Sequence, residues 1–184
     1  MPFDHFSFIA PVYARAGEYS GLQTMLRVAE LPAKGRLLDV GGGTGRVARS
    51  LREHADQVVV ADVSLGMLRF AASIPGLQAA ASASERLPFP DDSFARVLIV
   101  DALHHVADHA QTAAELWRVL QPGGRIVIQE PDIRTFGVKL IALAEKLLLM
   151  RSHFLSPPQI VDLFPQAETE IYIEAESAFV LVQK

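Results

Sequence analysis

The sequence predicts an α/β fold in which a mostly parallel, doubly wound sheet is covered by helices on both faces. Short β-rich runs alternate with segments of helical periodicity, as in successive β–α–β units. The clearest junction is the stretch 37–47, LLDVGGGTGRV, where an apolar run ends in an acid and a glycine-rich loop precedes a helix. With 184 residues, the chain is long enough for one well-packed domain and marginal for two, so we predict one domain over 1–184.

The predicted strands and helices follow one another in a regular order. Five candidate strands are 36–40, 57–61, 77–81, 95–100 and 125–129, and helical periodicity falls at 46–54, 65–72 and 107–120. The residues Pro122, Gly123 and Gly124 are typical of a turn, and we expect them to separate the last of these helices from the fifth strand.

The C-terminal part predicts two further strands, 168–174 and 178–183, joined around Glu176 and Ser177. So short a connection forces antiparallel pairing, which predicts a seven-stranded sheet with an antiparallel last strand. Residues 1–30 indicate a helical preface or lid, and 131–164 a helical insertion between strands five and six. The apolar run in this insertion lines a pocket, packs into the core or contacts a second copy, and the last alternative would give a homodimer.

Composition narrows the class of protein. Hydrophobic residues make up 50% and charged residues 21%, which is ordinary for a soluble domain. The net charge is −4 and the arginines are scattered, so we expect no nucleic-acid partner. The lack of cysteine excludes disulfides and thiolate chemistry and fits a cytoplasmic protein. Asp4 and His5 stand where a signal peptide would be basic, and the segment 136–150 is too short and too charged to span a membrane.

Carboxylates recur where predicted strands end. Asp39 lies just before the end of the first strand, Asp62 follows the second and Asp101 follows the fourth. In open α/β sheets, ligands bind at these carboxyl ends. Asp62 comes about 20 residues after the glycine loop, where an acid accepts hydrogen bonds from both ribose hydroxyls. The alternative is a solvated acid that caps the next helix.

The spacing of the glycines separates two cofactor classes. A dinucleotide loop has the pattern G-x-G-x-x-G, with its third glycine beside a pyrophosphate. Counted from Gly41, that third position is Arg46, whereas Gly43 and Gly45 follow at alternate positions. The loop therefore argues against a nicotinamide dehydrogenase, although Asp62 would suit either nucleoside.

Four segments carry a resemblance to a known family. The loop D-x-G-x-G-x-G from Asp39, the stretches 85–106 (ERLPFPDDSFARVLIVDALHHV) and 115–131 (ELWRVLQPGGRIVIQEP), and the aromatic start 3–17 (FDHFSFIAPVYARAG) resemble class I S-adenosylmethionine (SAM) dependent methyltransferases of the ubiquinone and menaquinone group. The resemblance implies a Rossmann-like fold, SAM as cofactor, and in-line methyl transfer to a small, apolar or aromatic molecule. A non-catalytic SAM-binding member that acts as an interaction module is the alternative.

The resemblance also implies roles for residues around the methionine part of SAM. Asp39 would order the loop through backbone amides and lie near the methionine end, with purely structural loop closure as the alternative. Gly41 and Gly43 would approach the amino acid portion, and Gly45 would allow the helix to pack. Tyr13 would lie near the methionine carboxylate.

Other positions would surround the nucleoside and the ammonium group. Val63 adjoins Asp62, and Met67 and Leu103 are either apolar walls for the adenine or plain core residues. Ala83 stands where relatives carry an acid that faces the adenine amino group. The backbone amide of Ser84 would bind a ring nitrogen of the adenine. The Ser84 hydroxyl or a water would replace the missing hydrogen-bond acceptor for the amino group. Asp101 would receive the SAM ammonium group, face the acceptor, or cap a helix.

The histidines suggest two kinds of site. His105 and His109, like His104 and Asp108, have the four-residue spacing of metal ligands on a helix. They follow a strand end, however, where adjacent side chains diverge, so we predict no metal. A hydroxyl or carbon-acid acceptor needs its proton removed, and His104, His105 and Tyr19 are the candidates for that role. The alternative is that neither histidine has a catalytic role.

Overall fold

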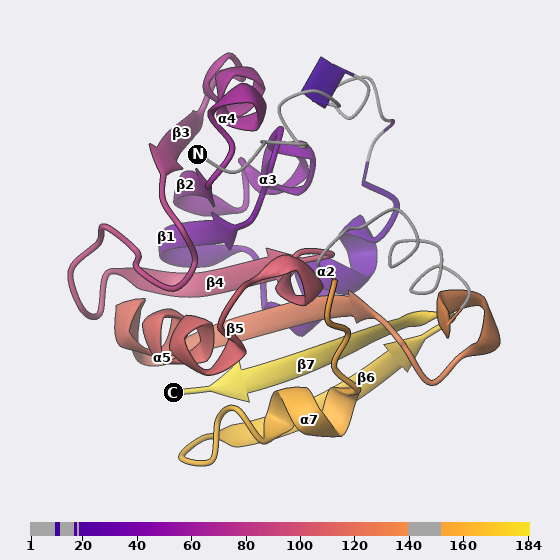
Figure 1. Cartoon of the computed structure of the whole chain (residues 1–184). Helices are drawn as coiled ribbons and strands as arrows, with labels where there is room; N and C mark the ends of the chain where they lie inside the picture. Colours follow the sequence, from indigo (N-terminus) through magenta and orange to yellow (C-terminus); the bar gives the residue numbers. More distant parts are fainter. Residues whose placement is uncertain (1–9, 12–16, 18, 140–151) are drawn as a thin grey trace.

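Seven strands form one sheet in the order β3-β2-β1-β4-β5-β7-β6 (Figure 1). The computed structural model describes residues 10–11, 17, 19–139 and 152–184. The strands are β1 (Ala33–Val40), β2 (Ala55–Asp62), β3 (Leu77–Ala81), β4 (Phe94–Val100), β5 (Leu120–Pro131), β6 (Glu168–Glu174) and β7 (Ser177–Gln183). Strands β1 to β5 pair in parallel, and β7 runs antiparallel to both β5 and β6. The predicted mostly parallel sheet with an antiparallel last strand is confirmed.

Helices cover both faces of this sheet (Figure 1). They are α2 (Leu22–Val28), α3 (Arg46–Leu51), α4 (Leu65–Ala72), the 3₁₀ helix η1 (Leu103–His105), α5 (His109–Val119) and α7 (Pro157–Val161). Helices α2, α3 and α4 pack on one face, and α5 and α7 on the other. Helix α4 has the predicted bounds because its cap is local: the Ser64 hydroxyl accepts from the Met67 amide.

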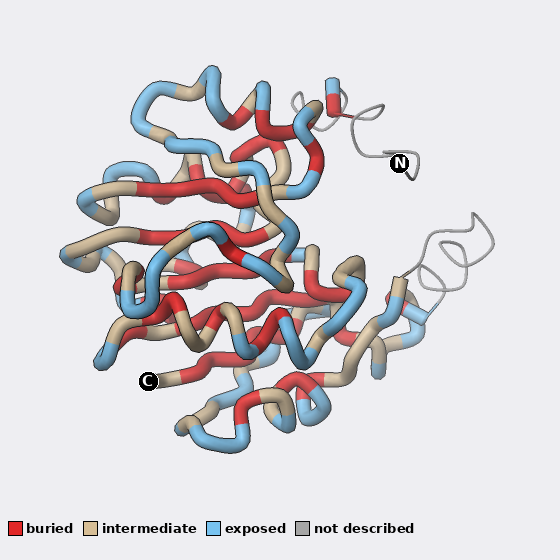
Figure 2. Tube along the Cα trace, turned by 60° about the vertical axis from the view of Figure 1, so that its left-hand side comes forward, coloured by how far each residue is buried: buried red, intermediate tan, exposed pale blue. Residues whose placement is uncertain are grey.

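Side chains of the central strands divide between two cores. Leu37 faces the core under α2, α3 and α4, whereas the next residue, Leu38, faces the core under α5 and α7. This alternation follows from the two-residue period of a strand, and both faces must be apolar because both are covered. The middle of the sheet is accordingly buried along its length (Figure 2). The core leaves only the strand ends for polar chemistry.

One predicted turn is part of a strand. Pro122, Gly123 and Gly124 lie within β5, at a bulge where the register against β4 shifts. The Gly123 amide donates to the Lys184 carbonyl, and the Lys184 amide donates to the Gly124 carbonyl. Gly123 has a φ of 77°, which glycine adopts without strain. Pairing with the distant C-terminal strand, which local composition does not reveal, extends β5 through this segment.

The described residues cover only part of two predicted regions. Helix α2 lies in the predicted preface 1–30, and α7 lies in the predicted insertion 131–164. Tyr13 and most of the apolar run of the insertion lie outside the described residues, so the homodimer stays a prediction. Within the described ranges, no helix is both long and apolar enough to cross a membrane.

Candidate active site

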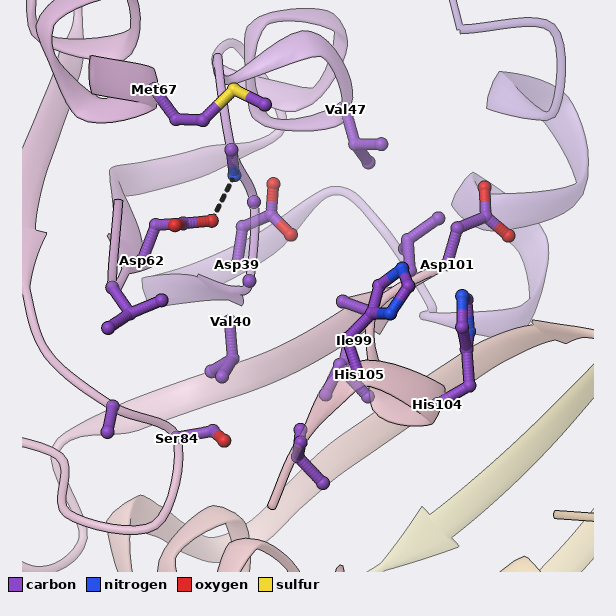
Figure 3. Close-up of a pocket in the computed structure, with 18 of the residues that line it drawn as sticks. Asp39, Val40, Val47, Asp62, Met67, Ser84, Ile99, Asp101, His104 and His105 are labelled. Atoms are coloured by element: carbon purple, nitrogen blue, oxygen red, sulfur yellow. Dashed lines mark hydrogen bonds between the residues drawn. The ribbon is translucent and has the colours of Figure 1, made fainter. Parts of the chain in front are cut away.

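A cavity of about 590 Å³ opens at the carboxyl ends of β1, β2 and β4 (Figure 3). Ligand cavities in proteins are typically of this size, and open α/β sheets place them at this edge. Most of the predicted site residues line it: Asp39, Gly41, Gly43, Asp62, Val63, Met67, Ala83, Ser84, Asp101, His104 and His105. The structure thus brings together predicted residues from four separate segments of the chain.

The glycine loop approaches the cavity without side chains. Gly41 and Gly43 have φ values of 68° and 55°, in the left-handed region. A Cβ on Gly41 would lie 2.6 Å from the Cβ of Ala102, so only glycine fits where the loop meets the segment after β4. Gly45 lies outside the cavity lining, and a Cβ there would lie 3.0 Å from Leu77 Cδ1. Gly45 therefore serves the packing of α3 and α4 against the sheet.

Asp62 holds the glycine loop in place. The Gly43 amide donates to Asp62 Oδ2 (2.9 Å; Figure 3), and the Ser64 amide donates to Asp62 Oδ1 (2.8 Å). An ionised carboxylate has about four acceptor sites, of which these amides occupy two. Ser64 is the N-cap of α4, and Asp62 binds the amide of that N-cap residue rather than an amide within the helix.

Asp39 is buried beside Asp62 and differs from it. Its side chain is 1% exposed, and neither carboxylate oxygen has a hydrogen-bond partner among the described residues. Burial, with a smaller contribution from the Asp62 carboxylate, raises the pKa of Asp39 to about 7 against the opposing effects of the nearby Ala48 amide and Arg46. The expectation that Asp39 orders the loop by accepting amides is wrong, because Asp62 accepts the loop amide instead.

The end of the cavity predicted for adenine contains a hydroxyl that the sequence did not indicate. The Ser84 hydroxyl lies 3.1 Å from Thr112 Oγ1 and donates to Glu85 Oε2 (3.2 Å), so it is engaged within the protein. Ser82 also lines the cavity, and its buried hydroxyl has no partner in the part of the chain that the structure describes. Ser82, one residue before Ala83, is thus better placed than Ser84 to replace the missing acceptor.

Leu103 belongs to the core. It is 1% exposed, packs in the core under α5 and α7, and does not line the cavity. The next residue, His104, does line it. With three residues per turn in a 3₁₀ helix, neighbours point in different directions, so η1 turns Leu103 inward. The prediction of Leu103 as an adenine wall is therefore wrong, whereas Met67 lies at the cavity as expected.

A buried carboxylate from β5 organises the opposite end of the cavity. Glu130 is 3% exposed, and its Oε1 accepts from the Ala102 amide (2.9 Å) and the Leu103 amide (2.7 Å). Its Oε2 lies 2.5 Å from His104 Nδ1. Glu130 was missed in the sequence, although it stands at the end of a strand, where the same rule identified Asp101.

His104 is held on two sides. Its side chain is buried, and beyond its contact with Glu130 its ring stacks on Phe154 with centroids 4.3 Å apart and planes 9° apart. His105 is half-buried, and its Nδ1 lies 3.3 Å from the Ser152 hydroxyl. Both histidines line the cavity near Asp101, away from Asp62 and Met67 (Figure 3).

Asp101 forms part of the same end of the cavity. Its side chain is 44% exposed and lies 3.9 Å from Arg46 Nη2. It has a φ of 52°, uncommon for a residue other than glycine. Desolvation and the Glu130 carboxylate raise the pKa of Asp101. The N-cap of η1 is Ala102, so the helix-cap alternative for Asp101 is wrong.

The residues with metal-ligand spacing make other contacts. Asp108 accepts from the Gln111 amide and caps α5, and the His109 ring packs edge-on against His153. Across the described ranges, no group of three or more histidines and carboxylates is arranged to hold a metal ion.

Tyr19 is unsuited to act as a base. Its hydroxyl donates to Gln129 Oε1, and burial, followed by Asp101, raises the pKa of the phenol well above its usual value. It lines a second, more polar cavity that shares only Arg46 and Asp101 with the first. The phenol keeps its proton at neutral pH, so the prediction that Tyr19 removes a proton from the acceptor is wrong.

Comparison with known proteins agrees with this geometry. A family model described as a methyltransferase domain matches residues 38–128. The demethylmenaquinone methyltransferase of Thermus thermophilus is 32% identical over 199 residues, covering 95% of this chain and 90% of that protein. That of Deinococcus radiodurans is 41% identical over 102 residues, so the chain spans about two fifths of that relative, 42% of its length.

Solved structures show the same fold. A SAM-dependent methyltransferase of Thermotoga maritima, described as a possible histamine N-methyltransferase, superimposes with a TM-score of 0.80 at 22% identity, covering 97% of this chain and 98% of that one. YcgJ of Bacillus subtilis gives 0.73 at 24% identity, covering 83% and 70%. The chain therefore belongs to the class I SAM-dependent methyltransferases, in the group that contains the ubiquinone and menaquinone enzymes.

Proposed function

We propose that this protein binds SAM in the cavity and transfers its methyl group to a small molecule. The observation that carries the proposal is the pair of carboxylates at the ends of β1 and β2. Asp39 is buried at the cavity with no partner among the described residues, and Asp62 fixes the glycine loop beside it. A buried unpaired carboxylate is costly, and a cationic ligand removes that cost.

The residues present suit the parts of SAM. Asp62 would accept the ribose hydroxyls, and Val63, Met67, Ala83 and the Ser84 amide would surround the adenine. Gly41 and Gly43 would let the backbone approach the amino acid portion, with the ammonium group near Asp39 or Asp101. When bound, SAM supplies a methyl group already activated on a sulfonium.

The chain's own contribution to such a reaction is chiefly alignment and exclusion of water. Proximity alone supplies up to about 7–11 kcal/mol of a barrier. The far end of the cavity, with Ile99, Val100 and Phe154, is partly apolar, which supports an apolar or aromatic acceptor. Because relatives are named demethylmenaquinone methyltransferases, a reduced naphthoquinone is the first acceptor to test. The cysteine-free composition supports a cytoplasmic setting.

Calorimetric titration with SAM and S-adenosylhomocysteine tests the binding. We expect dissociation constants on the order of micromolar, as for many enzyme ligands, and their loss in Asp62→Ala. Asp56→Ala is the matched control: Asp56 lies on the same strand and accepts from the Gly35 amide (2.7 Å), remote from the cavity. Failure of the unchanged protein to bind either compound would refute the proposal.

Transfer of a labelled methyl group tests the activity. The acceptors are 1,4-naphthohydroquinone, catechol and a set of simple amines, and the product is identified by mass spectrometry. Methylation of one of them supports the proposal. Tight SAM binding with no methylated product from a broad set would favour the non-catalytic interaction module instead.

A further inference from the structure

We propose that His104 is the general base of this methyl transfer and that Glu130 is its positioning residue. The acceptor would then be a proton donor, with a hydroxyl or an acidic C–H as the methylated group. This inference rests on the proposed function and specifies its acceptor class.

The two side chains form a buried pair between distant parts of the chain. His104 is 5% exposed and Glu130 is 3% exposed, and the pair joins η1 to the end of β5 across 26 residues of sequence. Burial strengthens the contact because the surrounding medium screens charges poorly. Phe154 stacks on the imidazole and limits its rotation, so the ring is held in one orientation.

The hydrogen bonds around Glu130 determine which nitrogen of His104 carries the proton. Glu130 Oε1 already accepts two backbone amides, from Ala102 and Leu103, and only Oε2 faces the imidazole. An ionised carboxylate can only accept, so His104 donates from Nδ1. In the neutral ring, Nε2 is then the acceptor nitrogen and the one through which a ligand's proton is exchanged.

His104 stands where an acceptor would meet the reactive end of SAM. It lines the cavity together with Asp101, at the end away from Asp62 and Met67 (Figure 3). If the nucleoside lies at the Asp62 end, the sulfonium and the acceptor lie toward His104. A base within hydrogen-bond reach of the acceptor contributes about 10²–10⁴-fold to such a rate.

The reaction balances with these groups alone. The proton leaves the acceptor oxygen or carbon for His104 Nε2, and the electron pair of that atom forms the new bond to the methyl carbon. The carbon–sulfur bond breaks with its pair retained on sulfur, which gives S-adenosylhomocysteine. Glu130 stabilises the imidazolium that forms, and the proton then passes to solvent.

Substitution of Glu130 by glutamine tests the pair with little change in shape. The two backbone amides need an acceptor, so the glutamine carbonyl keeps the place of Oε1 and its NH₂ turns to His104 Nδ1. That geometry forces the proton onto Nε2, and a base that already carries its proton cannot accept another. An equivalent change in a histidine–carboxylate pair lowers kcat about 10⁴-fold.

Two measurements follow, and the first needs no acceptor. Long-range ¹H–¹⁵N correlation on histidine-labelled protein is expected to show the Nδ1–H tautomer of His104 in the unchanged protein and the Nε2–H tautomer in Glu130→Gln. Glu115→Gln is the control, because Glu115 also accepts a backbone amide, from Leu87 (2.7 Å), but lies outside the cavity. It is expected to leave the tautomer unchanged.

The second measurement is methyl transfer to the accepted compound. Glu130→Gln is expected to lower kcat at least 100-fold while the dissociation constant for SAM stays within about twofold. If Glu130→Gln does not fold, His104→Asn replaces it: its amide can still donate to Glu130, Nε2 is gone, and added imidazole should restore part of the rate.

The outcomes separate this inference from the proposed function. An Nε2–H tautomer in the unchanged protein, or equal rates in Glu130→Gln, would overturn the role of the pair even if SAM binds. Loss of SAM binding by the unchanged protein would instead refute the proposed function. If no acceptor is methylated, an Nε2–H tautomer in the unchanged protein still overturns the inference, whereas an Nδ1–H tautomer supports the positioning of His104 by Glu130.

Discussion

The two ends of the cavity are held by different kinds of interaction. At the Asp62 end, backbone amides donate to a carboxylate within one β–α–β unit, over 19 residues or fewer. At the His104 end, Glu130 likewise accepts two backbone amides, but it also pairs with the His104 side chain across 26 residues, and a third segment supplies Phe154. On the proposed function, the end that would bind SAM is held by bonds within one β–α–β unit, and the end that would bind the acceptor is held by side chains from distant segments.

The largest effect on stability is expected from removing Glu130, the carboxylate that accepts hydrogen bonds at the His104 end of the cavity. Glu130→Ala leaves the Ala102 and Leu103 amides and His104 without their partner, and each buried donor costs about 1–3 kcal/mol. We expect the free energy of unfolding to fall by about 3–5 kcal/mol in urea titrations. Asp62→Ala frees two amides near solvent, where water replaces the acceptor, and should cost about 1–2 kcal/mol. Equal losses would remove the contrast between the two ends.

A pH-dependent effect is expected at Asp39. Its pKa in the folded protein, about 7, exceeds the ordinary aspartate value of 3.8, so the folded state binds more protons at pH values between the two. The stability that this proton contributes is full below about pH 4 and is lost as the pH rises toward 7. Relative to the unchanged protein, Asp39→Asn should therefore gain about 3 kcal/mol in unfolding free energy between pH 5 and pH 8. Parallel pH curves for the two proteins would contradict this.

Gly41→Ala tests the point where the two ends touch. An alanine at this position would have to adopt a positive φ, and its Cβ would lie 2.6 Å from Ala102 Cβ. We therefore expect the free energy of unfolding to fall by about 2 kcal/mol and the affinity for SAM to fall at least about tenfold. Gly123→Ala is the control, since Gly123 has a φ of 77° with nothing within 4 Å of the added Cβ. Its cost should be about 1 kcal/mol, with SAM affinity unchanged.

The smallest effect is expected at the adenine end. Ser82→Ala removes a hydroxyl with no partner in the described structure, so stability should hold while SAM affinity falls about three- to tenfold, the value of one hydrogen bond. Ser84→Ala should instead lower stability and leave SAM affinity unchanged, because the Ser84 hydroxyl contacts Thr112 and Glu85 and the Ser84 amide remains. Calorimetry measures the SAM affinity of both variants, and thermal unfolding measures their stability. Weaker SAM binding in Ser84→Ala than in Ser82→Ala would contradict this assignment.

Local signals predicted those parts of the fold whose partners are close in sequence. The bounds of β3, α4 and β6 agree with the sequence prediction, because caps, turns and strand periodicity are written within a few residues. The beginning of β5 was wrong because pairing with β4 and with the C-terminal Lys184 decides it. The family-level prediction rested on four motifs and is confirmed.

The sequence predicted those site residues that belong to a recognisable motif. Asp62 and the glycine loop lie at the cavity as the strand-end rule requires. Leu103 and His104 are neighbours, and only the phase of η1 decides which of them faces the cavity, a detail that composition does not carry. Glu130 obeyed the rule that identified Asp101, but its partners are 26 to 28 residues away and are apparent only in three dimensions.

Three carboxylates near the carboxyl ends of the strands, Asp62, Glu85 and Glu130, each accept hydrogen bonds from two backbone amides. Burial alone would raise the pKa of Glu85, but amides that include those of Asp108 and Ala107 outweigh it and lower that pKa, so this anchor persists until the medium is well acidic. Mild acid should therefore leave the enzyme assembled. Stronger acid should protonate Glu85 and weaken its hold on the Ala107 and Asp108 amides, which loosens the part of the cavity that Glu85 lines.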